Sequence, residues 1–116
     1  YPKDNTPGCT KEACSFRDNY AALANPDVVV IGVSADSVKS HQSFVSKFDL
    51  PFYLLSDPDK EVINAYGAWG EKTSYGKTSE GILRITYIIG PDGIIQTVFP
   101  QVKTATHAEE ILAVLG

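Results

Sequence analysis

Cys9 and Cys14 are the only cysteines of the chain, so any thiol chemistry depends on these two side chains. The three residues ahead of Cys9 are of types found at helix starts. The hydroxyl of Thr6 suits an N-cap, Pro7 fixes φ, and Gly8 permits a bend. We therefore expect a helix to begin at or just before Cys9. Free backbone N–H groups and the positive end of the helix dipole meet in a first turn, and both favour a thiolate over a thiol. The pattern predicts that Cys9 is a nucleophile.

The spacing of the two cysteines limits how they can react with each other. Five residues along an unbroken helix correspond to a rotation of about 140° and a rise of about 7.5 Å. A disulfide needs Cα atoms within about 7 Å of each other and converging Cβ vectors, so a bond between Cys9 and Cys14 requires the helix to unwind locally. Such a pair suits a disulfide that forms and breaks during turnover better than a permanent one.

Other uses of the two thiols are less favoured but stay open. Buried, unreactive cysteines are common in protein cores. A zinc site needs further ligands, and the only histidines, His41 and His107, are far from the cysteines in the sequence. The chain has no Cys-x-x-Cys motif, which argues against a thioredoxin-like dithiol. We expect His41 to be a packing residue and His107 to face solvent.

Arg84 is the other residue that suggests chemistry. It lies in a stretch that is otherwise Ile, Leu, Tyr and Thr, and a cation is costly to bury there unless it meets an anion. The Cys9 thiolate is one candidate partner and Glu12 is another, while an edge-strand arginine pointing into water is the third reading. Glu12 could equally be an exposed carboxylate favoured by the helix dipole, and Arg17 is similarly ambiguous.

Apolar periodicity and capping residues indicate the helices that hold these groups. Ala13, Phe16, Tyr20 and Leu23 share one face of the helix that carries both cysteines, which we expect to end before Asn25. Three further helices are expected: one capped by Asp36 and running to Phe48, one over 60–66 after an N-cap in 56–58, and a last one opened by a capping box over 106–109.

The strands are indicated by β-branched runs. The run over 27–34 is typical of a strand buried on both faces, 50–55 reads as a short strand, and 82–89 with 94–99 reads as a hairpin. Residues 67–81 lack a period and read as a long surface loop, in which Trp69 is either core or the rim of a site entrance. Strands alternating with helices predict an α/β fold with a mainly parallel sheet, to which the hairpin adds an antiparallel element.

Composition indicates one ordinary globular domain over residues 1–116. The chain is 43% hydrophobic and 21% charged, with a formal net charge of -4. It has no basic run, so a nucleic-acid partner is not expected, and its apolar runs are far shorter than a membrane span of about 20 residues. Cysteines at this spacing fit a reducing compartment, so we expect a cytoplasmic protein.

These residues carry a resemblance to the peroxiredoxins. Residues 1–13 and 16–18 are similar to the active-site segment of that family, closest to the peroxiredoxin Q group, also called bacterioferritin comigratory protein. The family motif Pro-x-x-x-Thr-x-x-Cys is present as Pro2, Thr6 and Cys9, and Cys14 stands where that group has its resolving cysteine. The match continues through 31–37, 50–52, 54–59, 65–70 and 84–89.

The resemblance implies a fold and a reaction. The fold would be thioredoxin-like, with a central mixed sheet flanked by helices, and relatives have further strands ahead of the point where this chain begins. Cys9 would reduce hydrogen peroxide or organic hydroperoxides, Cys14 would resolve the oxidised cysteine, and thioredoxin or a similar dithiol would recycle the pair. Arg84 and Thr6 would hold the peroxide and Pro2 would wall the pocket.

The same resemblance implies no metal, flavin or haem, and a monomeric protein. Two other functions stay open. One is a peroxide sensor or relay that uses the same cysteine pair, and the other is a binding module whose cysteines are inert.

Overall fold

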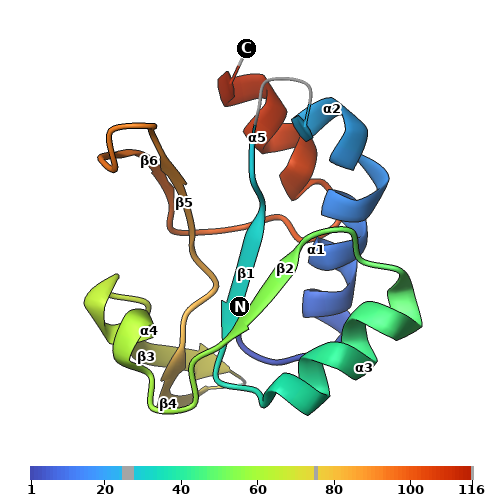
Figure 1. The fold of residues 1–116 in the computed structure, drawn as a ribbon. Helices are drawn as coiled ribbons and strands as arrows, with labels where there is room; N and C mark the ends of the chain where they lie inside the picture. The colour runs from blue at the N-terminus through green and yellow to red at the C-terminus, as the bar shows by residue number, and fades with distance from the viewer. Residues whose placement is uncertain (25–27, 75, 116) are drawn as a thin grey trace.

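The computed structural model describes residues 1–24, 28–74 and 76–115 (Figure 1). Helices and strands alternate along the chain, as the sequence predicts. The helices are α1 (Pro7–Asp18), α2 (Tyr20–Ala24), α3 (Val38–Phe48), α4 (Glu61–Ala65) and α5 (His107–Leu115). The strands are β1 (Ile31–Ser34), β2 (Tyr53–Ser56), β3 (Trp69–Ser74), β4 (Lys77–Ile82), β5 (Thr86–Ile89) and β6 (Ile95–Phe99).

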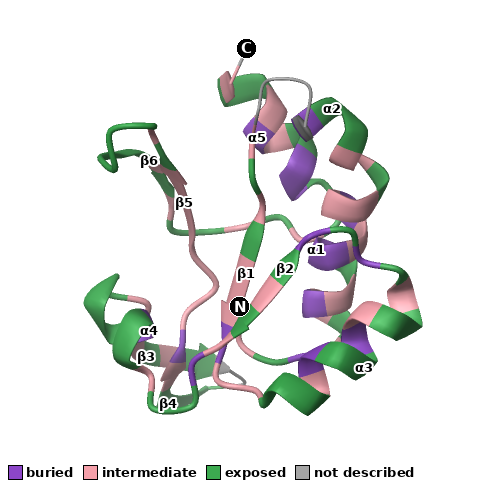
Figure 2. Cartoon of the chain, viewed as in Figure 1, coloured by how far each residue is buried: buried purple, intermediate pink, exposed green. Residues whose placement is uncertain are grey.

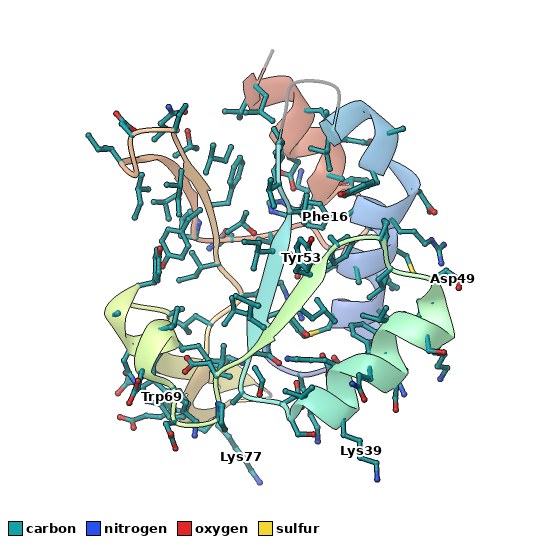
Figure 3. The ribbon with its side chains drawn as sticks, in the orientation of Figure 1. Phe16, Lys39, Asp49, Tyr53, Trp69 and Lys77 are labelled. Atoms are coloured by element: carbon teal, nitrogen blue, oxygen red, sulfur yellow. The ribbon has the colours of Figure 1, made fainter. Side chains whose placement is uncertain are left out.

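Helices α1, α2, α3 and α5 gather on one side of the β1–β2 pair, and β5–β6, β3–β4 and α4 lie on the other side (Figure 1). Two apolar clusters pack the helical side. Ala13, Phe44, Leu50 and Phe52 form the first, and the second is built on Leu23, Ala108 and Ile111. Phe16 of α1 packs against both clusters and therefore links them (Figure 3). The helix that carries the cysteines is thus fixed by its apolar face.

The strands pair as two antiparallel hairpins and one parallel pair. β1 pairs with β2 in parallel, while β3 with β4 and β5 with β6 are antiparallel. Parallel and antiparallel pairing are both present, as predicted, but the expectation of a mainly parallel sheet was wrong, because only one of the three described pairs is parallel. The described strands form three separate two-stranded sheets. A groove of about 960 Å³ is lined by both β1 and β5 as well as by Cys9 and Arg84.

The first predicted strand is shorter and more exposed than the sequence indicated. β1 begins at Ile31, Asp27 is outside the described residues, and Val29 and Ile31 are 68% and 53% exposed (Figure 2). Burial on both faces is therefore wrong for these residues. The physical reason is that, among the described residues, β1 pairs with β2 alone and has helices on one side only, so its other edge faces the groove.

The segment predicted as a loop over 67–81 is the β3–β4 hairpin, so that prediction was wrong. Six residue pairs align from Trp69 opposite Ile82 to Ser74 opposite Lys77, and Tyr75 is outside the described residues. Most side chains of the hairpin are polar and exposed, so backbone pairing forms it without an alternating apolar pattern. Trp69 is half-buried at its start, with the Lys60 ammonium 5.5 Å from the ring centre (Figure 3).

The predicted strand 82–89 is interrupted. β4 ends at Ile82 and β5 begins at Thr86, so Arg84 lies in a three-residue break between two hairpins. A residue outside a ladder is not bound to the alternation of strand side chains, and this leaves Arg84 free to turn toward α1. The break therefore explains how a cation in an apolar stretch reaches a polar partner.

Three local predictions at helix starts were also wrong. The N-cap of α4 is Lys60 and not a residue of 56–58. Ser37, and not Asp36, is the N-cap of α3, and its hydroxyl accepts from the Ser40 N–H. His107 does not face solvent, because its side chain is fully buried at the start of α5. Its Nε2 lies 2.8 Å from the Thr86 hydroxyl, and Phe16 packs edge-on against its ring. Within the described residues, none of the helices has the length and apolar character needed to cross a membrane.

Candidate active site

The start of α1 has the form expected from the sequence. Thr6 is the N-cap with extended φ and ψ, Pro7 is the first helical residue, and the Thr10 N–H donates to the Thr6 carbonyl at 2.8 Å. Cys9 is therefore in the first turn, where backbone N–H groups have no partner inside the helix. The Thr6 side chain departs from the usual cap, because its hydroxyl donates to the carbonyl of Lys3 at 3.0 Å.

Arg84 joins α1 at Cys9 and Glu12. Its Nη2 lies 3.3 Å from the Cys9 sulfur, and its Nη1 donates to Glu12 Oε1 at 2.8 Å. The two partners that the sequence left as alternatives are thus both present, one on each arm of the guanidinium. Cys9 is only 2% exposed and the Glu12 side chain 11% exposed, so these contacts lie in a largely dry environment.

Two cations, Arg84 and Lys72, interact with Cys9. Burial opposes a charge on Arg84, but its hydrogen bonds and charge interactions with Cys9 and Glu12 raise the pKa of the guanidinium above its ordinary value. Lys72 of β3 is a second cation nearby. Burial and the positive charge of Arg84 lower the Lys72 pKa, while the charge of Cys9 opposes that shift. Arg84 is thus held in its charged form with one arm directed at the Cys9 sulfur.

Gly8 is needed for the close approach of Arg84. A Cβ at this position would lie 3.0 Å from Arg84 Nη2, which is tighter than ordinary van der Waals contact. A side chain at residue 8 would therefore push the guanidinium away from the helix. The glycine before Cys9 allows the helix start and the arginine to touch, in addition to permitting a bend.

The resolving candidate Cys14 is half-buried on the same helix. α1 is continuous from Pro7 to Asp18, so the rotation between the two cysteines is that of a regular helix, and both are free thiols. A bond between them would require the turn from Thr10 to Cys14 to unwind. The next residue, Ser15, is buried and accepts from the Ala108 N–H at 3.2 Å, which ties α1 to α5.

Pro2 lies in the half-buried segment that leads into α1. On either side of it the chain is held in place. The amino group of Tyr1 donates to the Val33 carbonyl at 2.8 Å, and Asp4 is buried. Pro2 therefore has a fixed position in the segment between Tyr1 and Thr6.

Sequence reasoning missed Lys72, because the segment that carries it read as a loop and gave no sign of lying beside Arg84. It also assigned no role to Asp4. Among the described residues, the one cluster of possible metal ligands consists of Asp4, Asp36 and His41, so neither cysteine belongs to it.

Comparison with known proteins finds close similarity over nearly all of the chain. The model of the AhpC/TSA family matches residues 1–98. The putative peroxiredoxin bcp of Coxiella burnetii is 52% identical over 112 residues, which are 97% of this chain and 74% of that protein. Peroxiredoxin Bcp of Escherichia coli is 46% identical over 112 residues, which are 97% of this chain and 72% of that protein.

Solved structures resemble the fold equally well. The bacterioferritin comigratory protein of Xanthomonas campestris matches with a TM-score of 0.91 at 40% identity, over 99% of this chain and 73% of that one. This likeness confirms the predicted thioredoxin-like α/β fold.

Proposed function

The chain belongs to the AhpC/TSA family, in the peroxiredoxin Q or bacterioferritin comigratory protein group, and from this membership we propose that Cys9 is its peroxidatic cysteine. Peroxiredoxins are peroxidases that reduce a peroxide at the expense of a thiol reductant. The observation that carries the proposal is the Arg84 guanidinium at 3.3 Å from the Cys9 sulfur, at the first turn of a helix.

In the proposed reaction the Cys9 thiolate attacks the terminal oxygen of a hydroperoxide. An S–O bond forms as the O–O bond breaks, sulfur loses two electrons, and the peroxide gains them. The products are a sulfenic acid on Cys9 and an alkoxide or hydroxide, which takes a proton and leaves as an alcohol or water. The Xanthomonas campestris relative is described as having alkyl peroxide reduction activity, so we include alkyl hydroperoxides with hydrogen peroxide as substrates.

Arg84 and Thr6 supply the polar contacts for this step. The guanidinium stays charged and has further N–H donors, so it can hold the sulfur and also stabilise the charge that develops on the leaving oxygen. The Thr6 hydroxyl donates its hydrogen bond to the Lys3 carbonyl, which leaves its oxygen lone pairs to accept from the peroxide O–H. Pro2 would wall the pocket and has no N–H to offer water.

Cys14 completes the cycle in this proposal. When α1 unwinds between the cysteines, the Cys14 thiolate attacks the sulfenic sulfur and displaces hydroxide, which leaves as water and gives an intramolecular disulfide. A dithiol reductant, which we propose to be thioredoxin, then reduces the bond by exchange. Phe16 packs against both apolar clusters, so we propose that residues 1–116 form a single domain and that this domain carries out the reaction.

The test is NADPH consumption with thioredoxin, its reductase and either hydrogen peroxide or an alkyl hydroperoxide. We expect steady turnover by the unaltered protein, none by Cys9→Ser, and a single turnover by Cys14→Ser that leaves a sulfenic acid trappable by dimedone. Peroxide consumption by Cys9→Ser would place the nucleophile elsewhere. Full turnover by Cys14→Ser would contradict the intramolecular disulfide, and oxidation of the unaltered protein without turnover would contradict recycling by thioredoxin.

A further inference from the structure

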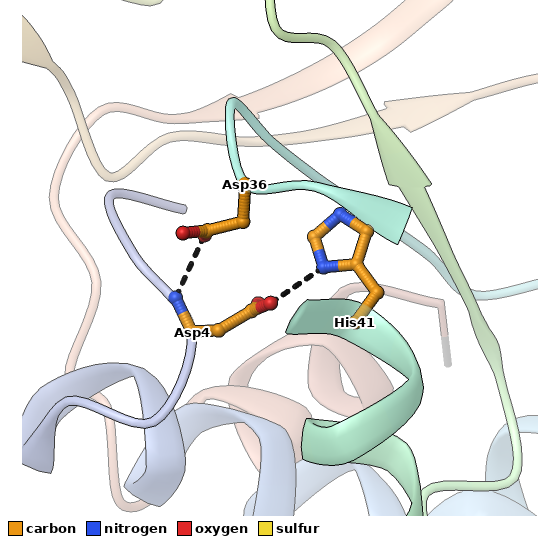
Figure 4. A group of neighbouring side chains, drawn as sticks. All are labelled: Asp4, Asp36 and His41. Atoms are coloured by element: carbon orange, nitrogen blue, oxygen red, sulfur yellow. Dashed lines mark hydrogen bonds and ion pairs between the residues drawn. The ribbon is translucent and has the colours of Figure 1, made fainter. Parts of the chain in front are cut away.

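Three side chains from three parts of the chain meet beside the start of α1 (Figure 4). Asp4 comes from that segment, Asp36 from the loop between β1 and α3, and His41 from the first half of α3. The Asp4 and His41 side chains are only 3% and 5% exposed. Burying a carboxylate is costly unless it is fully hydrogen-bonded, so the cluster calls for a physical explanation.

The Asp4 carboxylate is surrounded by donors. Its Oδ2 lies 2.7 Å from His41 Nδ1 (Figure 4). The same oxygen accepts from the Ser40 hydroxyl at 2.8 Å, and Oδ1 accepts from the Tyr1 hydroxyl. Burial and the hydrogen bond to Asp4 raise the pKa of the Tyr1 phenol, so this group keeps its proton and acts as a donor. The carboxylate is therefore held from the segment itself and from α3.

The second ring nitrogen of His41 extends the link to β2. Its Nε2 lies 3.1 Å from the Leu55 carbonyl, which can only accept, so Nε2 carries a proton. A further proton must then lie between Nδ1 and the Asp4 carboxylate, because two lone pairs would otherwise face each other at 2.7 Å. The pair is thus joined by a hydrogen bond whose proton lies between the ring nitrogen and the carboxylate.

Asp36 holds the backbone of the same segment. Its carboxylate accepts from the Asp4 N–H at 2.8 Å and from the Ser34 hydroxyl at 2.7 Å. Asp4 is therefore bound through its main chain and its side chain, to the loop after β1 and to α3. These oxygens and nitrogens already bond to protein groups, so we interpret the cluster as a structural contact and not as a metal site. We call the group of Asp4, Asp36 and His41 the brace.

The braced residue stands midway between the two groups that would shape the peroxide pocket. Pro2 is two residues before Asp4 and Thr6 is two residues after it. The Thr6 hydroxyl donates to the carbonyl of Lys3, the neighbour of Asp4, so any shift of Asp4 moves the atom that orients that hydroxyl. The sulfur and the guanidinium, by contrast, are fixed by α1 and the 83–85 break and have no direct bond to the brace.

We propose that Asp4 and His41 are positioning residues for peroxide reduction, which hold the segment from Tyr1 to Thr6 so that Pro2 and Thr6 stay in place above Cys9. This inference rests on the proposed function of Cys9. It separates two requirements of the reaction, because the brace would set the geometry of the peroxide and leave the reactivity of the thiolate to α1 and Arg84.

The test compares two reactions of the same sulfur in Asp4→Asn and His41→Phe. Oxidation by hydrogen peroxide needs the pocket, whereas alkylation by iodoacetamide needs only the thiolate. We expect the peroxide rate constant to fall by about tenfold to a hundredfold, since a misplacement of about 1 Å can cost that much. The alkylation rate should stay within about twofold of the unaltered protein, so the ratio of the two rates falls. His41→Gln, which keeps one donor, should retain more peroxide activity than His41→Phe.

Asp57→Asn is the matched control. Asp57 is also a buried carboxylate, 8% exposed, and accepts from the Glu61 and Ile63 N–H groups at the start of α4, away from the segment before α1. It should lower the melting temperature and leave the ratio unchanged. An unchanged ratio in Asp4→Asn, or equal losses in both reactions, would overturn the positioning role. Absence of peroxide reduction by the unaltered protein would instead refute the proposed function.

Discussion

Replacing Arg84 tests the central contact of the candidate site. In Arg84→Met the Cys9 sulfur loses the Nη2 donor at 3.3 Å, and the Glu12 carboxylate loses its Nη1 partner at 2.8 Å. Methionine keeps an unbranched side chain of similar reach, so the substitution removes charge and donors with little change in packing. In Arg84→Lys the charge remains, but a single ammonium cannot occupy the positions of both guanidinium nitrogens.

The magnitude follows from the contacts. A hydrogen bond to a charged group contributes about 1.5–3 kcal/mol, and about 1.4 kcal/mol corresponds to a tenfold change in rate. Arg84→Lys should therefore lower the rate constant for oxidation by hydrogen peroxide by about tenfold to a hundredfold. Arg84→Met should cost about a further tenfold, because it also leaves the buried Glu12 carboxylate facing the sulfur anion without compensation.

Competition against a second peroxidase for limiting hydrogen peroxide measures the rate constant. Alkylation by iodoacetamide should fall along with it, since Arg84 acts on the thiolate itself. The double variant Glu12→Gln with Arg84→Met should recover about the last tenfold, because the uncompensated carboxylate is gone. Arg17→Met is the control: this arginine lies on the same helix but bonds the Phe48 carbonyl and Asp18, so we expect the unaltered rate. A rate for Arg84→Met within about threefold of the unaltered protein would refute the reasoning.

Three further substitutions test the packing that positions α1 and the strands, each by the free energy of unfolding in urea. Leu23→Ala removes a fully buried side chain and should cost about 2–5 kcal/mol, whereas a loss below about 1 kcal/mol would mean that the second cluster can collapse around the gap. Ser15→Ala leaves the buried Ala108 N–H without its acceptor and should cost about 1–3 kcal/mol, so unchanged stability would show that this contact does not tie α1 to α5. Gly32→Ala puts a Cβ at 2.7 Å from Leu54 Cδ2 and should cost about 1–3 kcal/mol; a neutral result would show that Leu54 moves aside freely.

The local order around Cys9 could be predicted because short-range signals specify it. Thr6, Pro7 and Gly8 mark a helix start from their own side chains and backbone preferences, and the helix begins there. The cost of burying Arg84 predicted an anionic partner and left Cys9 and Glu12 as alternatives, since only the tertiary structure could bring residue 84 to residues 9 and 12. That the guanidinium takes both candidates reflects its forked shape.

The features that the sequence analysis missed or predicted wrongly are not specified by short-range signals. His107 looked exposed because helix first turns often are, yet Thr86 and Phe16 from distant parts of the chain bury it and satisfy its ring. The β3–β4 hairpin lacks apolar alternation because little of it packs on a core, so periodicity could not find it. The brace at Asp4 could not be predicted because Asp36, Ser40 and His41, which bind Asp4, lie 32 to 37 residues away in the sequence.

The two anchors of α1 differ in how they respond to the proposed reaction. The far half of the helix is held by Ser15 and Phe16 through a hydrogen bond and apolar packing, and neither contact depends on the state of Cys9. The near half is held by the contact of Arg84 with the sulfur and with Glu12. Conversion of a thiolate to a neutral sulfenic acid removes the charge that Arg84 pairs with and so weakens the near anchor alone. The turn that must unwind to bring Cys14 to Cys9 includes Glu12 of the near anchor and ends before Ser15 of the far anchor, so oxidation itself would favour the unwinding that resolution requires.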